Sequence, residues 1–430
     1  MTTFAGQVQT LFVDSFEADP MPKTALMVMA NTNLVPVAKG SNTFRLFYKP
    51  WKRGVRTNLA GLRGLGAGLN PLTTHPTYAG QLPSQTLPNA YEDVTIDTVY
   101  TDAYDIDETS GLDALYNSPE RVAARVREVY QNGLVQHQHE ECAMQAVYSD
   151  EWLVLPAATI SLASSVTAAA TTFKITDALK ASSGIAVGDL VKIGDKRVLN
   201  ATNGVVETVD VVLVKTVGAD GTGSGSNSLI TIETVAAYFP VSYTLTGNCF
   251  AKIKTELAGH SSGARVQIDR PIALSSSVSF ESYLGSLRTL AARQFIDPTK
   301  LTIYMPPEVE ENLCLSTSPL LANFLLGEKI LMQGSVSTVR GFNLVSDANA
   351  ISRAKQGLVG NADLSKVRHY VWAFERNNTF GYAQMLKSMA NDKIIGVAGL
   401  LSKLSWVDIS GSILGRQGAM RSILMVVTVN

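Results

Sequence analysis

Apolar residues recur at three- and four-residue steps through one long segment, residues 118–148. Ser118 stands at the N-cap position, Pro119 in the first turn, and Glu120 where a carboxylate meets the positive end of the helix dipole. The pattern predicts a helix of roughly 30 residues, about 45 Å long, on which other elements pack. Its apolar face consists of Val122, Val126, Val129, Leu134, Met144 and Val147.

Two strand patterns precede this helix. Phe44, Leu46 and Tyr48 alternate with basic residues, and a second strand-like run spans Val94–Tyr100. Between them, Thr57–Ala90 contains many glycines and prolines and little apolar periodicity. The sequence therefore predicts an extended two-stranded arm with a loose tip. Such an arm is not stable alone in water and must lie on another surface.

The charges on this predicted arm are segregated. The segment from Phe44 to Arg63 is basic. The segment from Glu92 to Asp113, which spans the second predicted strand and the connector from that strand to the helix, is acidic. The charges either pair across the strands of one hairpin or join the arm to a neighbouring copy; phosphate binding by the basic segment is a third possibility. The candidate intersubunit contacts are Arg45, Lys49, Trp51, Lys52, Arg53, Arg56, Arg63, Asp97, Asp102, Asp105, Asp107 and Glu108.

Composition shifts after Pro156. Residues 157–258 are rich in small and β-branched residues, with turn signals at Gly194-Asp195 and Asn203-Gly204. This pattern predicts an inserted all-β module, barrel-like, of about 100 residues, which is large enough to fold alone.

The remaining chain alternates between helical and strand periods. The predicted elements are a helix at Ser279–Phe295, a strand at Leu301–Met305, a helix from Pro306-Pro307, a helix at Leu320–Ile330, a strand at Gly341–Val345, a hairpin of Val367–Phe374 with Thr379–Leu386, and a buried strand at Ile423–Val429.

Composition narrows the class of protein. The 430 residues are 46% hydrophobic and 17% charged, with a net charge of −1, which indicates an ordered chain and argues against a general nucleic-acid binder. The three cysteines are far apart, so we expect a reducing compartment and no disulfide framework. The sequence shows no signal peptide and no apolar run of about 18 residues, so we expect a soluble protein made inside the cell.

Candidate chemistry is sparse. Gly259–Gly263 matches the G-x-S-x-G motif of serine hydrolases around Ser261, but a strand pattern follows where that motif requires a helix. His137 and Glu141 stand four residues apart on the predicted helix, which is too few ligands for a metal site. We therefore expect no enzymatic activity, cofactor or metal, and a Gly/Ser turn at residues 259–263.

The order of these parts resembles the major capsid protein of tailed double-stranded DNA bacteriophages, whose Hong Kong 97-type fold encapsulins and herpesviruses share. The resemblance implies an α+β fold that comprises an N-terminal arm, an extension loop, a spine helix with a peripheral domain, and an axial domain, here with an inserted β module. The corresponding segments are 1–40 (N-terminal arm), 41–100 (extension loop), 101–156 (spine helix and peripheral domain), 157–258 (β module), 259–350 (axial domain) and 351–430 (closing strands).

The resemblance also implies a function. Copies of the chain would assemble as hexamers and pentamers into an icosahedral head shell, in the virion and built in the host cytoplasm. Further implied partners are portal, scaffolding and decoration proteins and non-specifically contacted DNA, with no membrane. An encapsulin-like nanocompartment shell is the nearest alternative, and a serine esterase that uses Ser261 is a distant one.

Overall fold

A computed structural model describes most of the predicted core. The described residues are 25–31, 34–39, 42–47, 91–95, 98–107, 149, 151–153, 160–194, 209–220, 227–234, 238–240, 250–252, 254–275, 280–293, 296–313, 338–348, 350, 352–355, 363–394, 401–413 and 421–429, with residues 120, 121, 124, 125, 128, 129, 132, 133, 142, 146 and 147.

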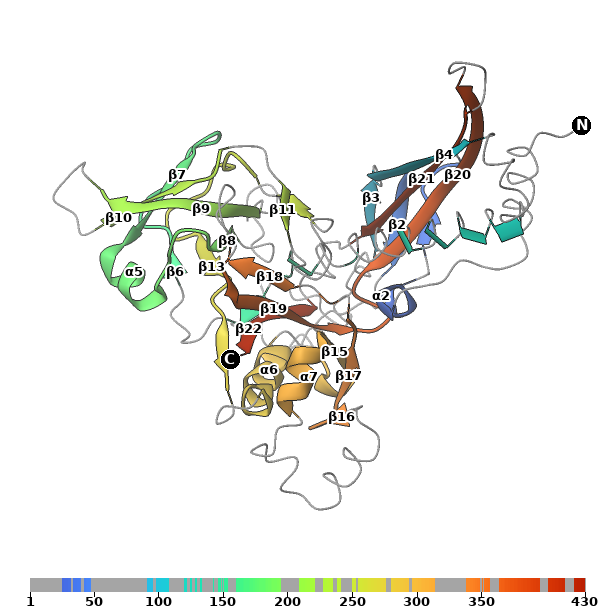
Figure 1. Ribbon diagram of the computed structural model, residues 1–430. Helices are drawn as coiled ribbons and strands as arrows, with labels where there is room; N and C mark the ends of the chain where they lie inside the picture. Colours follow the sequence, from blue (N-terminus) through green and yellow to red (C-terminus); the bar gives the residue numbers. More distant parts are fainter. Residues whose placement is uncertain are drawn as a thin grey trace, which may run out of the picture.

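A mixed eight-stranded sheet lies at the centre (Figure 1). In order across the sheet the strands are β14 (Ile272–Leu274), β22 (Ser422–Val429), β19 (Asp363–Glu375), β15 (Leu301–Met305), β17 (Phe342–Ser346) and β16 (Thr338–Val339), with β5 (Glu151–Leu153) on β22 and β18 (Ser352–Lys355) on β19. β22 pairs antiparallel with β19 and parallel with β14 and β5, whereas β15 pairs parallel with β17.

Both faces of this sheet are buried, which explains why its strands are apolar almost throughout. Along β19, Val371 and Ala373 point into one hydrophobic cluster, whereas Tyr370, Trp372 and Phe374 point into another. The second cluster is aromatic: the Trp372 ring lies 4.4 Å from the Phe374 ring, centroid to centroid. The alternation of side chains along each strand thus supplies two cores from one sheet.

Two helices, α6 (Glu281–Arg293) and α7 (Pro307–Leu313), cover the first face. The short 3-10 helix η2 (Pro298–Lys300) leads into β15. Asn312 of α7 links the two helices, because its Oδ1 accepts a hydrogen bond of 2.8 Å from the backbone N–H of Phe280, just before α6. The helices gathered on one face of a mixed sheet confirm the predicted α+β class.

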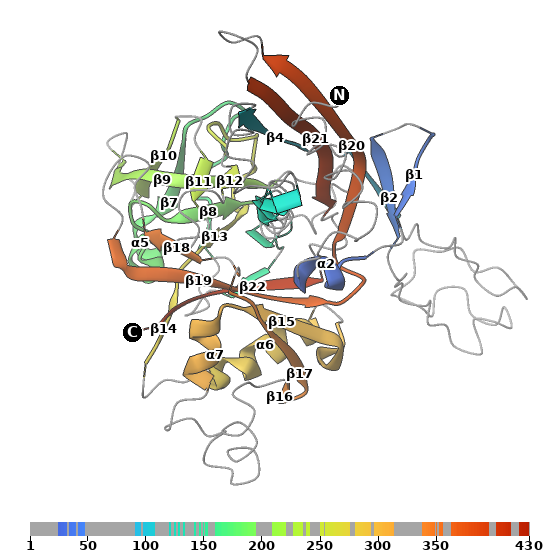
Figure 2. The ribbon, with the colours of Figure 1, turned by 45° about the vertical axis from the view of Figure 1, so that its right-hand side comes forward.

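The predicted β module forms a six-stranded sheet, on the opposite side of the central sheet from α6 and α7 (Figures 1 and 2). The backbone N–H of Ala163 donates to Lys174 O at 2.9 Å, which joins the two edges of the sheet into a barrel. In order the strands are β6 (Ile160–Ser161), β13 (Arg265–Ile268), β8 (Leu190–Ile193), β9 (Asp210–Ala219), β10 (Asn227–Ile232) and β7 (Thr172–Thr176).

The barrel differs from the prediction in two respects. Its strand β13 lies beyond the expected boundary at residue 258, because β13 fills the position between β6 and β8. It also contains a short helix, α5 (Asp177–Ser183), capped by Thr176 at its start and by Gly184 in the left-handed region at its end. A separate two-stranded sheet pairs β11 (Tyr238–Pro240) with β12 (Phe250–Lys252).

The predicted arm begins as a three-stranded antiparallel sheet of β1 (Leu34–Pro36), β2 (Thr43–Phe47) and β3 (Tyr91–Thr95). The second predicted strand, Val94–Tyr100, is wrong as a single element. The chain leaves β3 and enters β4 (Thr98–Asp107), which joins a different sheet with β21 (Leu401–Ile413) and β20 (Gly381–Ile394). Much of the expected acidic connector is therefore strand.

The hairpin predicted around Asn377-Asn378 is also wrong. β19 pairs with β22, β15 and β18, whereas β20 pairs with β21, so the chain passes from one sheet to another at this turn. Thr379 stabilises the turn: its Oγ1 donates to Glu375 O and accepts from Glu375 N. Asn377 takes a positive φ of 57°, which asparagine tolerates better than most residues.

Part of the predicted long helix is described, and those residues are helical. Cys142, Ala146 and Val147 are buried in the aromatic core, together with Leu26 of the N-terminal helix α2 (Ala25–Met29). Val129 is 49% exposed, so this position departs from the predicted apolar face. The helix predicted at 320–330 and the proposed cap at 118–119 lie outside the described residues.

Candidate functional site

The predicted contact residues fall into three groups. Arg45 is fully described, on β2. Asp102, Asp105 and Asp107 lie in β4, where Asp105 is the register partner of Lys403 on β21. The others lie outside the described residues: Lys49, Trp51, Lys52, Arg53, Arg56, Arg63, Asp97 and Glu108.

Arg45 forms a cross-strand ion pair within its own chain. Arg45 on β2 is the register partner of Asp93 on β3. Its Nε donates to Asp93 Oδ1 at 2.7 Å and its Nη2 to Oδ2 at 2.9 Å. These hydrogen bonds hold the pKa of Asp93 below its usual value. For this pair, the hairpin alternative is therefore the observed one.

The sheet of β1, β2 and β3 has one covered and one open face. Leu46 is buried, packed with Leu34 and Phe44 against Ala383. Close approach requires Gly381 there, since a Cβ at this position would lie 3.0 Å from Leu34 Cδ2. The open side presents three exposed apolar residues, which we call the outer arm face: Val35 (51% exposed), Val37 (47%) and Phe47 (42%).

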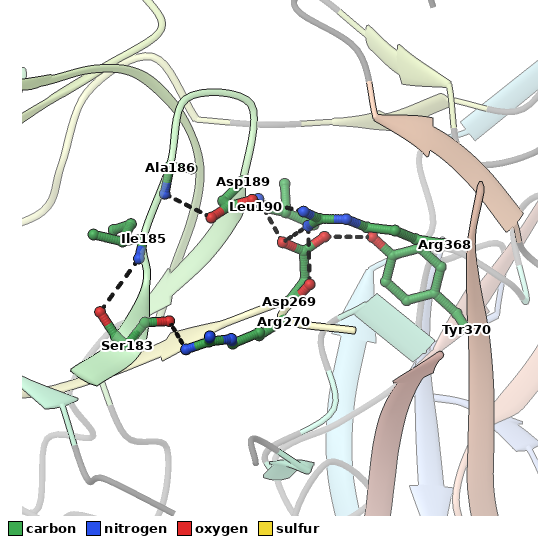
Figure 3. Close-up of polar contacts among 9 residues, drawn as sticks. All are labelled: Ser183, Ile185, Ala186, Asp189, Leu190, Asp269, Arg270, Arg368 and Tyr370. Carbon is green, nitrogen blue, oxygen red and sulfur yellow. Dashed lines mark hydrogen bonds and ion pairs between the residues drawn. The ribbon is translucent and has the colours of Figure 1, made fainter. Parts of the chain in front are cut away.

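A buried ionic network joins the barrel to the central sheet (Figure 3). Arg368 of β19 donates from Nη2 to Asp189 Oδ1 at 2.8 Å and from Nη1 to Asp269 Oδ1 at 2.7 Å. The Tyr370 hydroxyl donates to Asp269 Oδ2 at 2.9 Å. Asp189 precedes β8 and Asp269 follows β13, so two ends of the barrel meet one guanidinium. We call Asp189, Asp269, Arg368 and Tyr370 the junction.

Burial governs the electrostatics of the junction. It raises the pKa of Asp189, as does the nearby Asp269, and Arg368 only partly opposes them. Burial alone would lower the pKa of Arg368, but the two aspartates outweigh it, so the arginine remains charged. One feature of the sequence indicates such a network: Arg368 lies inside an apolar strand, and an arginine in that position needs a buried partner.

Arg270, next to Asp269, extends these contacts to α5. Its Nη1 donates to the carbonyl oxygens of Ser182, at 3.1 Å, and Ser183. Gly184, with a φ of +62°, leaves room for this guanidinium, because a Cβ there would lie 3.1 Å from it. The barrel segments that carry Asp189 and Asp269 are thereby braced against each other.

The G-x-S-x-G segment, residues 259–263, forms a turn that leads into strand β13. This confirms the prediction of a Gly/Ser turn followed by a strand in place of a helix. His260 is buried, and its Nε2 lies 2.7 Å from Asp210 Oδ2. Asp210 also accepts from Lys254 and from the backbone of Ala258. Burial alone would raise the pKa of Asp210, but these hydrogen bonds hold it below its usual value. The arrangement anchors residues 254–260 to β9 and lacks the context of a hydrolase serine.

Metal and membrane candidates gain no support. His137 and Glu141 lie outside the described residues, and within the described part of the chain no three His, Cys, Asp or Glu residues cluster to hold a metal ion. Among the same residues, no helix has the length and apolarity needed to cross a bilayer.

Comparisons with known proteins give structural matches only. No protein-family model matches the chain, and no curated protein does. A chain from Mycobacterium phage Che8 matches with a TM-score of 0.44 and 9% identity over 95% of this chain and 92% of that one. A chain of the mature capsid of bacteriophage PhiM1 matches with a TM-score of 0.44 and 11% identity, over 96% of this chain and 89% of that one. A chain of a virus-like particle from Pyrococcus furiosus matches with a TM-score of 0.36 and 8% identity, over 97% of each chain.

Proposed function

We propose that this chain is a major capsid protein, whose copies self-assemble into the icosahedral head shell that encloses phage double-stranded DNA. The observation that carries the proposal is the pairing of β2 with β3, from Thr43↔Thr95 to Phe47↔Tyr91. This pairing brings the two ends of residues 48–90 together at one sheet. A long segment that starts and ends at the same sheet has the layout expected of an arm that reaches a neighbouring copy.

The outer arm face supplies the first contact surface of this proposal. Val35, Val37 and Phe47 are about half exposed on one sheet, beside the Arg45–Asp93 pair. This arrangement suits a partner subunit that covers the apolar side chains and leaves the ion pair at the rim of the interface. Because Arg45 is already paired within its own chain, intersubunit ionic contacts fall to the basic residues further along the arm, among them Arg53 and Arg56.

The sheet of β20, β21 and β4 supplies the second surface. Within the described residues, β20 and β4 are its edges, and edge strands present unpaired N–H and C=O groups that can pair with another chain. Two different patches on each subunit permit heterologous contacts, which generate rings such as hexamers and pentamers. A net charge of −1 keeps such a wall from repelling itself. Portal, scaffolding and decoration proteins and packaged DNA are the further proposed partners, in a virion assembled in the host cytoplasm.

Negative-stain microscopy of the purified chain tests the proposal. We expect closed shells or capsomer rings from the natural sequence. Deletion of residues 58–88 should leave a folded subunit, by circular dichroism, that no longer assembles. Monodisperse monomers of the natural sequence under all assembly conditions would overturn the proposal. Particles that package protein cargo instead of DNA would favour the encapsulin-like alternative.

A matched pair of surface variants tests the outer arm face itself. Val35→Ser with Phe47→Ser should weaken assembly and leave a folded subunit, by circular dichroism, since both side chains are about half exposed. Val187→Ser is the control, because Val187 is 52% exposed on the barrel, away from the arm. Equal assembly of both variants would remove the outer arm face from the proposal.

A further inference from the structure

The barrel has a complete interior of its own and is nevertheless buried on one outer side. β8 and β9 alternate between these two environments. The side chains that point inward, into the barrel core, include Val191, Ile193, Val212 and Val214. The side chains that point outward, into the aromatic core of the central sheet, are Leu190, Val211 and Leu213. The barrel is thus a separate unit docked on a second one, and the junction lies at their boundary.

The junction holds more negative than positive charge. Two carboxylates from the barrel share the single guanidinium of Arg368, and Tyr370 contributes a neutral hydroxyl. Asp189 is 4% exposed, Asp269 0% and Arg368 6%, so water screens this imbalance poorly. Among the four junction residues, two carboxylates therefore face one guanidinium.

The two carboxylates are not equivalent. Asp269 accepts hydrogen bonds from the Leu190 amide at 2.8 Å, from Arg368 and from Tyr370. Asp189 accepts from Arg368 and from the Ala186 amide at 2.8 Å. Burial, and then the nearby Asp269, raises the pKa of Asp189. Asp189 is therefore the carboxylate that we take to bind the proton.

Three other charged or titratable side chains lie on the elements that carry the junction. Arg270 is bound to the carbonyl groups at the end of α5. Lys192, two residues beyond Leu190, lies with its Nζ 5.8 Å from the centroid of the Trp152 ring. His369 points to the opposite face of β19, where Glu308 is its charged neighbour.

We propose that the junction is a proton-dependent latch, in which Asp189 takes up a proton when the barrel is docked on β19, so that docking tightens as the pH falls toward the ordinary range of an aspartate. The latch needs no bound ligand and does not depend on whether the chain assembles into a shell. Its two states are a docked barrel, with the junction formed, and a barrel loosened from β19 with its own core intact.

The sign of the effect follows from linkage. The pKa of Asp189 is raised in the folded chain, chiefly by burial and then by Asp269. The stabilising effect of its proton is therefore fully present below the ordinary pKa of an aspartate and is lost as the pH rises through the raised value. Asp210, in the barrel, behaves oppositely, because its pKa is lowered. Acid strong enough to protonate Asp210 loosens the barrel, so the tightening occupies the window above that point.

Hydrogen exchange of the unassembled subunit tests the latch. The reporters are the amides of Ala186 and Leu190, which donate to Asp189 and Asp269. The reference amides are those of Val212 and Ile230, whose side chains lie inside the barrel. As the pH is lowered from neutral toward the ordinary pKa of an aspartate, we expect the protection factors of the reporters to rise, by up to about tenfold per pH unit for one linked proton. The reference amides should not follow this slope.

Two variants decide whether Asp189 is responsible. Asp189→Asn should abolish the slope at the reporters. Asp220→Asn is the matched control. It should keep the slope, because Asp220 follows the last residue of β9, pairs with Lys174 and is not part of the junction. A flat profile in the natural sequence, a slope shared by the reference amides, or a slope that survives in Asp189→Asn would each overturn the proposal. If Asp189→Asn folds poorly, the pH dependence of the reporter amides in the natural sequence still tests the proposal.

Discussion

Replacing Arg368 by methionine is the most informative perturbation of the junction. The Arg368 side chain is 7% exposed, and its fork contacts Asp189 at 2.8 Å and Asp269 at 2.7 Å. Methionine occupies a similar length of the strand and packs with the apolar neighbours of β19, so the main loss is the charge. Two buried carboxylates then face each other without that cation.

The magnitude follows from the cost of breaking a buried pair. Removing one partner of such a pair costs about 3–5 kcal/mol, because an uncompensated charge remains in a poorly screened site. Here two carboxylates are left, so we expect Arg368→Met to lie toward the upper end of that range. Lys215→Met in the barrel is the control. Lys215 is 47% exposed in its 3.3 Å pair with Glu233, so solvent screening limits its loss to about 1 kcal/mol or less.

Urea unfolding followed by tryptophan fluorescence measures the difference, since Trp372 lies on the same face of β19 as Arg368. A triple variant, Arg368→Met with Asp189→Asn and Asp269→Asn, should recover part of the stability, because no buried charge is left unpaired. Two outcomes would refute a large cost of leaving the two carboxylates without Arg368. One is that Arg368→Met costs no more than Lys215→Met, and the other is that the triple variant is the least stable of the three.

Three further outcomes test the fold. Asn312→Ala should cost about 1–2 kcal/mol of unfolding free energy in urea, because it leaves the first amide before α6 without its acceptor, and Asn312→Asp should cost less. Gly184→Ala should lower stability by about 1–3 kcal/mol, because the positive φ and the Arg270 guanidinium both oppose a Cβ, and a melting point equal to that of the natural chain would contradict this. The isolated fragment 157–270 should melt cooperatively by circular dichroism, whereas 157–258, which lacks β13, should not.

Elements with complete local signals were predictable from the sequence. β15 occupies the predicted residues, α7 begins at the predicted Pro307, and α6 lies within the predicted range. In each case a residue that starts or stops the element lies next to a clear hydrophobic periodicity. β17 follows a turn in which Arg340 and Gly341 have positive φ, and the glycine marked that turn in advance.

Pairings between distant segments were not predictable in the same way. β4 is acidic and not apolar, and it becomes a strand because β21, some 300 residues later, supplies its hydrogen-bonding partner. β13 lies beyond the module boundary predicted at residue 258, because the barrel needs one more strand between β6 and β8. In both cases the element is defined by its partner, and a local pattern contains no information on the partner.

The junction adds a reason why a largely apolar interface should contain buried charge at all. Leu190, Val211 and Leu213 hold the barrel against the central sheet, but apolar contact is non-directional and tolerates sliding or rotation. A planar guanidinium that binds two carboxylates is directional, and here the carboxylates come from two different segments of the barrel. Fixing both segments to one side chain of β19 removes those freedoms. We therefore expect the triple variant to restore stability while leaving the barrel less uniquely placed, with faster hydrogen exchange at the Leu190 amide than its unfolding free energy alone requires.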